Sequence, residues 1–250
     1  MLFHVDSDAR APARSPEPNT GAAVSDPVAA RLLTTLAPRD PQGVVLVLHG
    51  GAARRHGMRV SPAQLSVLRM IPVARRVAQA GGDRLAVFRL LNSVRGWDTH
   101  HTPVHDVEWA LDQLRERFGE ALPTCLVGHS LGGRAAIGAG ALPEVRSVAA
   151  LAPWVYVTDG TGDLTGRQVM VVHGTEDHIA SPTRALAVAR NLQRTAEVGF
   201  ISVEGGRHAM LRHHRSFDGY AAMFAAATLL GDPATGPVAE VLDGATFVEA

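Results

Sequence analysis

The sequence predicts an α/β fold in which helices flank a mainly parallel central sheet on both sides. Short apolar runs rich in β-branched residues recur along the chain, as expected for strands that are buried on both faces. Segments with helical spacing separate these runs, and such alternation implies crossover connections between parallel strands. With 250 residues, of which 46% are hydrophobic, the chain can bury one sizeable core.

Six apolar runs are the predicted strands. The first, GVVLVLHG at 43–50, ends in a histidine and a glycine. The other five have the same character and span residues 84–90, 123–130, 147–153, 168–174 and 198–206. Because parallel strands end at one edge of a sheet and ligands bind outside that edge, residues just beyond these runs are the candidates for function.

Start signals and apolar spacing predict the helices. Three of them open at Ser-Pro or Thr-Pro pairs, at residues 61–62, 102–103 and 181–182. Pro72 lies inside the first and is expected to kink or divide it. A last helix, marked by Phe217, Tyr220 and Phe224, is expected to stop at Gly231.

Both ends of the chain are predicted to be tails. Residues 1–25 have too few large apolar side chains to offset the entropy of ordering, which favours a flexible segment. The folded domain is expected over residues 26–231, followed by a poorly specified tail at 232–250. One hypothesis assigns contacts with a partner protein to these tails.

Charge and composition narrow the class of partner. Lys plus Arg equals Asp plus Glu at 24 each, so no overall field draws the protein to nucleic acid or to an anionic membrane. The single cysteine, Cys125, lies in an apolar run and excludes an internal disulfide. No segment has the roughly 18 apolar residues of a membrane helix, and no signal peptide is evident. We therefore expect a soluble, cytoplasmic protein with a small-molecule partner and no membrane insertion.

The stretch VGHSLGGRAA places Ser130 between glycines at the end of an apolar run. A serine at a sharp turn from strand to helix exposes its hydroxyl only if its neighbours lack bulk. Gly128 and Gly132 meet this need, and the segment fits G-x-S-x-G, the nucleophile elbow. The alternative is that Ser130 only caps the following helix. In its strand and helix context the motif resembles that of the α/β-hydrolases, which implies the α/β-hydrolase fold.

The resemblance implies that an acid and then a histidine follow the serine along the chain. Asp177 lies beyond the run QVMVVHG in a loop that resembles the acid loop of the family, and His208 lies in a loop that resembles its histidine loop. The alternatives are Glu176, Asp159 and Asp163 for the acid and His213 and His214 for the histidine. His173 and His178 are expected to shape the acid loop. No metal-ligand spacing such as H-E-x-x-H is present, so neither a metal nor a cofactor is expected.

Attack on a carbonyl creates a negative oxygen that backbone N–H groups must stabilise. The residue after the nucleophile, Leu131, is the first expected donor of this oxyanion hole. The turn at 49–52, His-Gly-Gly-Ala, resembles the H-G-G turn of the family and is expected to supply the second. Gly51 is the preferred donor, with Ala52 as the alternative.

Loops at the same predicted edge provide candidate substrate contacts. Ala52, Arg95 and Trp154 are the principal ones, and a solvated or packing role is the alternative for each. Further candidates in these loops are Arg54, Arg55, His56, Trp97, His100 and His101.

The stretch at 154–167 is too short for the cap domain that many relatives insert there, so an open pocket without a large cap is expected. Over about residues 40–230 the chain resembles small, lidless bacterial α/β-hydrolases, some described as dienelactone-hydrolase-like. The resemblance implies a serine hydrolase that cleaves a carboxylic ester through an acyl-enzyme. The alternatives are a thioesterase, acyltransferase, amidase or perhydrolase with the same triad, and a binding protein that keeps the fold without turnover.

Overall fold

A computed structural model describes residues 29–51 and 60–250 of the chain. Within these residues one sheet of eight strands has the order β1-β3-β2-β4-β5-β6-β7-β8. The strands are β1 (Arg31–Leu36), β2 (Gly43–Leu48), β3 (Leu85–Leu91), β4 (Thr124–His129), β5 (Val145–Leu151), β6 (Gln168–Gly174), β7 (Glu197–Val203) and β8 (Phe247–Glu249). Strand β1 runs antiparallel to β3, and all other neighbours are parallel. The predicted α/β fold is confirmed.

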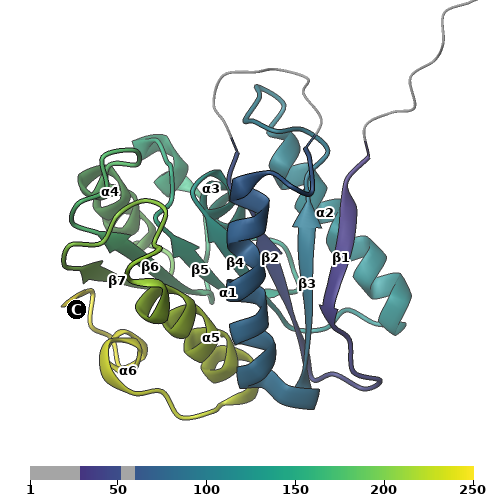
Figure 1. Cartoon of the computed structure of the whole chain (residues 1–250). Helices are drawn as coiled ribbons and strands as arrows, with labels where there is room; N and C mark the ends of the chain where they lie inside the picture. Colours follow the sequence, from purple (N-terminus) through teal and green to yellow (C-terminus); the bar gives the residue numbers. More distant parts are fainter. Residues whose placement is uncertain (1–28, 52–59) are drawn as a thin grey trace, which may run out of the picture.

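Helices cover both faces of this sheet. They are α1 (Leu65–Gly81), α2 (Thr102–Phe118), α3 (Leu131–Gly138), α4 (Pro182–Leu192), α5 (His214–Leu230) and α6 (Gly236–Leu242), with short 3-10 turns η1 (Gly82–Arg84) and η2 (Val157–Thr161). Helices α1, α5 and α6 pack on the face that is turned to the viewer in Figure 1, and α2, α3 and α4 pack on the other.

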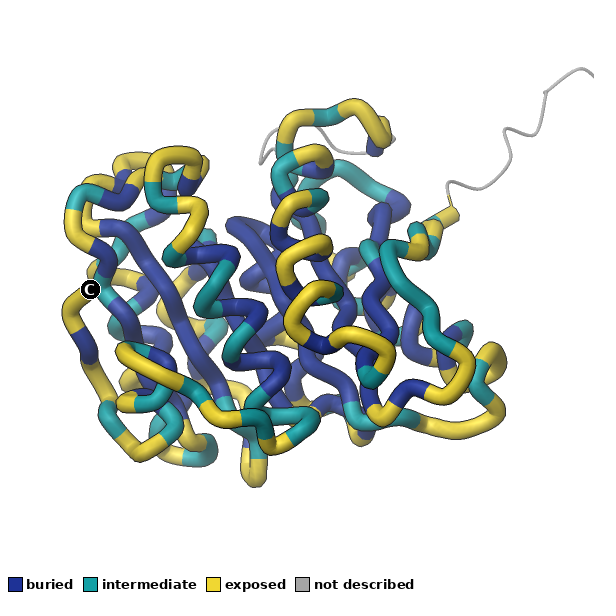
Figure 2. Tube along the Cα trace, turned by 60° about the horizontal axis from the view of Figure 1, so that its bottom comes forward, coloured by how far each residue is buried: buried dark blue, intermediate teal, exposed yellow. Residues whose placement is uncertain are grey.

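The sheet lies between two apolar layers because successive side chains of a strand point to opposite faces. In β2, Val45 and Val47 pack with α1 and α5, whereas Leu46 and Leu48 pack with α2 and α3. All four are buried, as are most strand residues in Figure 2. Burying one such side chain contributes about 1.5–3 kcal/mol, so the packing of the central strands stabilises the sheet strongly.

The strand order reverses at β2, which pairs with β3 on one side and with β4 on the other. The carboxyl ends of β2 and β4 are therefore adjacent, with Leu48 paired to Gly128. Because these strand ends are adjacent, the turn after β2 and the serine after β4 lie side by side. Ligands bind at such a switch point, in the crevice that the loops leave open.

The first helix, α1, differs from its prediction both in its N-cap residue and in the effect of Pro72. Its N-cap is Gln64, not Ser61, whose hydroxyl instead accepts a hydrogen bond from the Ala63 amide in the preceding turn. Pro72 neither ends nor divides α1, which runs unbroken over 17 residues. Pro72 lies on the exposed side of the helix, where water can satisfy the carbonyl that the missing N–H leaves free.

The expectation of a C-terminal tail at 232–250 is wrong. Residues 236–242 form α6, and residues 247–249 form β8, which extends the sheet by pairing with β7. Val238, Val241 and Val248 are buried against the same apolar layer as α5. These three valines are enough to order the segment because they pack against a sheet and a helix that are already formed. The sequence of the segment alone does not show that this apolar surface is available.

The N-terminal end also departs from expectation. The predicted tail at 1–25 lies outside the described residues. The strand β1 at Arg31–Leu36 was not predicted, because its sequence is not a continuous apolar run. Its residues are half-buried or exposed, as is typical of an edge strand. In the described parts of the chain, no helix is long and apolar enough to cross a membrane.

Candidate active site

Ser130 stands at the turn between β4 and α3 with φ 57° and ψ −119°, a conformation that L residues rarely adopt. Its amide donates to the Leu151 carbonyl, and its carbonyl accepts from the Trp154 amide, both at 3.0 Å. A Cβ at Gly128 would overlap with the Gly132 carbonyl, and a Cβ at Gly132 would overlap with the Leu48 carbonyl. The two glycines are therefore required by close backbone contacts, and the strained serine is held by the ends of β4 and β5.

Three side chains from three loops meet at this turn. His208 Nε2 lies 3.0 Å from Ser130 Oγ, and His208 Nδ1 lies 2.8 Å from Asp177 Oδ2. Asp177 follows β6 and His208 follows β7, so the sheet order brings them beside the serine after β4. The structure thus brings together the three residues predicted as catalytic. The arrangement lets an imidazole take the hydroxyl proton while a carboxylate orients its ring.

The Asp177 carboxylate is buried and fully bonded. Its Oδ1 accepts from the amides of Ile179 and Ala180 at 2.8 and 2.9 Å, and its Oδ2 lies 3.1 Å from His173 Nε2. Burial alone would raise the pKa of Asp177, but the hydrogen bonds from His173, His208 and Ala180 outweigh it and hold this pKa well below its usual range. The group is therefore a fixed carboxylate near neutral pH. His173 shapes the acid loop as expected, whereas His178 is exposed.

His129 holds the backbone of the histidine loop. Its Nε2 donates to the His208 carbonyl oxygen at 2.8 Å, and the two ring centroids are 4.9 Å apart. Burial and the neighbouring His208 lower the pKa of His129 to about 3, so that its ring is neutral at pH 7. The sequence reasoning gave His129 no role, although its place inside the elbow motif is a signal that a polar, buried side chain there needs a partner.

The turn after β2 is set by His49, which the sequence placed in the H-G-G turn without indicating a role for its side chain. The Asn92 amide donates to His49 Nε2 at 3.2 Å, which leaves Nδ1 as the donor to the Gly50 carbonyl at 2.6 Å. Burial lowers the pKa of His49, which favours this neutral form. In a trans peptide the carbonyl and the next N–H point to opposite sides, so His49 also fixes the direction of the Gly51 amide.

A cavity of about 360 Å³ opens at the triad. It is lined by Gly50, Gly51, Ser66, His129, Ser130, Leu131, Trp154, Ile179 and His208. None of these residues is a carboxylate, a lysine or an arginine. Both residues predicted for the oxyanion hole, Gly51 and Leu131, thus lie at the serine, and Trp154 is the aromatic residue of the wall. The described part of the lining is therefore neutral and largely apolar.

The other candidates lie elsewhere. Arg95 is not among the residues that line the cavity; its carbonyl instead packs against Gly51, where a Cβ would overlap with it. Trp97 stacks on the Arg134 guanidinium, with 3.9 Å from Cζ to the ring centroid. His100 and His101 lie in the exposed turn that precedes α2. Ala52, Arg54, Arg55 and His56 lie outside the described residues.

The rival acids and histidines have other partners. Glu176 pairs with Arg207 at 3.0 Å on the surface, Asp159 pairs with Arg134, and Asp163 accepts from Thr165. His213 is the N-cap residue of α5, and His214 is its first residue. None of these groups bonds to Ser130, so the geometry favours Asp177 and His208 over them. In the described part of the chain no three His, Cys, Asp or Glu side chains gather as metal ligands would.

Several solved structures have a fold similar to that of this chain. Est1E from Butyrivibrio proteoclasticus is 13% identical and matches with a TM-score of 0.54 over 78% of this chain and 91% of that one. An alpha-beta serine hydrolase homologue from Coxiella burnetii is 15% identical, with a TM-score of 0.57 over 77% and 89%. A putative alpha/beta hydrolase of unknown function from Agrobacterium tumefaciens is 15% identical, with a TM-score of 0.59 over 83% and 94%.

The chain has the α/β-hydrolase fold. No protein-family model and no curated protein sequence matches it. Within this α/β-hydrolase scaffold only η2 and its flanking loops lie between β5 and β6, so no cap domain is inserted there. The resemblance to dienelactone hydrolases stays a prediction.

Proposed function

We propose that the protein is a serine hydrolase that cleaves carboxylic esters through an acyl-enzyme. The observation that carries this proposal is the continuous chain of contacts from Asp177 through His208 to Ser130, which lines the cavity. A serine hydroxyl is a weak nucleophile, and this chain is the arrangement that activates it. The names of the similar structures, Est1E and an arylesterase among them, are consistent with an ester as substrate.

The reaction uses only residues of this chain. His208 takes the proton from Ser130 as Oγ attacks the ester carbonyl, and Asp177 stabilises the resulting imidazolium. The amides of Gly51 and Leu131 hold the oxyanion, each worth roughly 3–4 kcal/mol in the transition state. The tetrahedral intermediate collapses to an acyl-enzyme and releases the alcohol, which takes its proton from His208. Water activated by His208 then releases the acid and restores the serine.

The lining of the cavity supports a neutral acyl or alkyl group. Leu131, Trp154 and Ile179 give it apolar surface, and no fixed charge among its described residues would pair with an ionic substrate. We therefore propose a substrate with an uncharged acyl chain. A small-molecule partner without nucleic acid, a cytoplasmic location and the absence of a cofactor stay predictions from the sequence.

The decisive experiment compares Ser130→Ala with the wild type on short p-nitrophenyl esters. We expect turnover to fall by about 10³- to 10⁶-fold, and a fluorophosphonate probe to label the wild type once per chain but not the variant. Ser147→Ala is the matched control, because Ser147 is also buried and hydrogen-bonded but contacts Thr228 instead of the triad. Equal activity of Ser130→Ala and wild type would show that Ser130 is not the nucleophile.

A panel of esters, thioesters and amides tests the reaction type with the Ser130→Ala protein as blank. Faster turnover of a thioester or amide than of any ester would assign the same triad to another bond. A folded protein that neither reacts with the probe nor turns over any substrate would favour a binding protein.

A further inference from the structure

The loop that carries His208 is strained and needs external support. Its turn closes with a hydrogen bond of 2.9 Å from the Met210 amide to the Arg207 carbonyl. Met210 is buried and has φ 57°, a left-handed conformation that side chains other than glycine rarely adopt. Such strain persists only when the surrounding structure over-determines the backbone. The contacts that hold this turn therefore also set the position of the imidazole.

Two side chains from other elements hold consecutive carbonyls of this loop. His129 donates to the carbonyl of His208 at 2.8 Å, as described above. Arg69, in α1, donates from Nε to the carbonyl of Ala209 at 2.9 Å. Residues 69 and 209 are 140 positions apart in the chain. The second tether thus connects the histidine loop to a helix on one face of the sheet.

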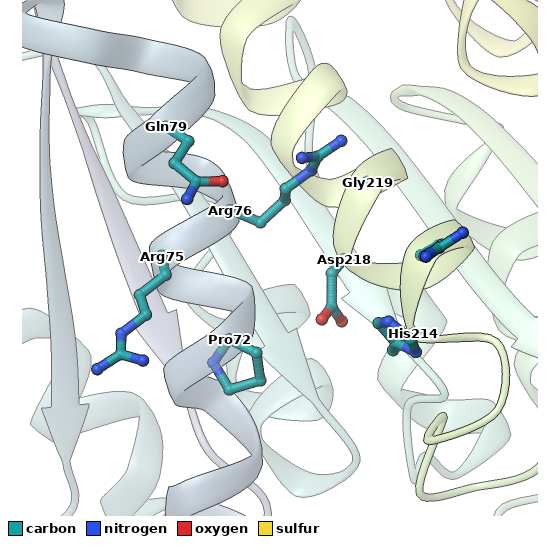
Figure 3. Close-up of a pocket in the computed structure, with 8 residues that line it drawn as sticks. Pro72, Arg75, Arg76, Gln79, His214, Asp218 and Gly219 are labelled. Atoms are coloured by element: carbon teal, nitrogen blue, oxygen red, sulfur yellow. The ribbon is translucent and has the colours of Figure 1, made fainter.

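Arg69 is itself oriented by a buried carboxylate. Its Nη2 donates to Asp218 Oδ1 at 2.7 Å, and its Nη1 donates to Asp218 Oδ2 at 3.4 Å. The two side chains are only 8% and 6% exposed, so water competes little for this pair. Figure 3 shows the Asp218 carboxylate between α5 and α1, at a groove of about 440 Å³ that is also lined by Arg75 and Arg76. Neither of these arginines makes an ion pair with Asp218 among the described contacts.

We propose that Arg69, oriented by Asp218, is a positioning residue that holds the His208 loop where the imidazole can take the Ser130 proton. The inference rests on the proposed function, because it assigns a role in that reaction. Arg69 does not line the cavity at the triad, so it acts on the reacting atoms through the loop and not through the substrate. A misplacement of a catalytic group by about 1 Å can lower the rate by about 10²-fold.

The test is Arg69→Gln, measured against Arg84→Gln. Arg84 also forms a two-bond pair, with Asp232 at 2.8 and 2.7 Å, and links the α1 region to the end of α5, although these two side chains are more exposed than those of Arg69 and Asp218. It precedes β3 and so lies at the amino ends of the strands, away from the triad. Both variants lose one Arg–Asp pair, but only Arg69→Gln loses the tether to the histidine loop.

We expect Arg69→Gln to lower kcat at least about tenfold and to change KM by less than about twofold, whereas Arg84→Gln keeps the kcat of the wild type. Arg69→Lys, which retains a donor and the charge, should recover part of the loss. Wild-type kcat in folded Arg69→Gln, or an equal loss in Arg84→Gln, would overturn the proposal.

A second measurement separates this proposal from the proposed function. The NMR signal of the His208 Nδ1 proton reports its hydrogen bond to Asp177 without any substrate. We expect this signal in the wild type and in Arg84→Gln and expect it to shift or disappear in Arg69→Gln. If no substrate is turned over, the signal still decides whether Arg69 positions His208, and an unchanged signal in Arg69→Gln counts against it.

Discussion

The ring of His129 lies against the ring of His208, and its Nε2 bonds to the backbone carbonyl of that same residue at 2.8 Å. The residue before the nucleophile thus supports the residue that activates it. This contact requires a proton on His129 Nε2. Burial and the neighbouring His208 lower the pKa of His129 to about 3, so the ring is neutral near pH 7 and Nε2 carries its single ring proton.

This pKa predicts how stability changes with pH. Below its ordinary value of 6.5, His129 of the unfolded chain binds a proton that the folded protein excludes until about pH 3. The unfolded state therefore binds more protons in this window, and the free energy of unfolding falls as the pH falls from 6.5 toward 3. In His129→Gln we expect the slope to decrease by about 1.4 kcal/mol per pH unit. Urea unfolding at several pH values measures it; parallel curves for variant and wild type would contradict the prediction.

Asp177→Asn tests the orienting carboxylate. An amide can offer its N–H₂ to His208 and favour the wrong tautomer, so we expect kcat to fall by about 10⁴-fold in a folded protein. Glu176→Gln is the control, because the side chain of the neighbouring Glu176 bonds to Arg207 on the surface and not to His208. Steady-state hydrolysis of a p-nitrophenyl ester measures both. Similar losses in the two variants would show that the loop as a whole, and not the Asp177 carboxylate, is responsible.

The same substitution, glycine to alanine, should have opposite effects in two helices. In Gly132→Ala the new Cβ would overlap with the Leu48 carbonyl and lie 2.7 Å from that of His49, so we expect destabilisation by about 1–3 kcal/mol or more. In Gly219→Ala the Cβ would meet nothing within 4 Å, and the better helix former should stabilise α5 by about 0.5–1 kcal/mol. Thermal unfolding of both variants gives the signs. A stabilising Gly132→Ala would mean that the backbone contact at the elbow is not required.

Val238→Ala tests whether the C-terminal segment belongs to the fold. Val238 is fully buried, so the loss of two methyl groups should lower the free energy of unfolding by roughly 2 kcal/mol. Val157 is 50% exposed, and Val157→Ala should stay within about 0.5 kcal/mol of the wild type. Denaturant titrations compare the two. An unaffected Val238→Ala protein would restore the expectation of a tail.

Much of the α/β-hydrolase fold could be predicted because strands buried on both faces leave a local mark. The runs at 43–50 and 123–130 are mainly apolar, and β2 and β4 are buried throughout. Edge strands have no continuous apolar run in the sequence, because they are only partly buried: β1 is half-exposed, and β8 has three residues, of which Val248 alone is buried. Pro72 shows the same limit, since whether a proline ends a helix depends on which side of the helix faces water.

The sequence by itself determined which residues were the candidates for the site. Gly128 and Gly132 mark Ser130 because only glycine avoids the neighbouring backbone, and Asp177 and His208 are marked by their place after apolar strands. Their contact with one another follows from the order of strands in the sheet.

Only the tertiary structure decided which side chains support them. That Arg69 reaches the Ala209 carbonyl and His49 sets the Gly50 turn depends on how helices and loops far apart in the chain pack on the sheet. Local patterns record how one element is buried, whereas a hydrogen bond between distant residues depends on distances of a few ångströms that no pattern along the chain contains.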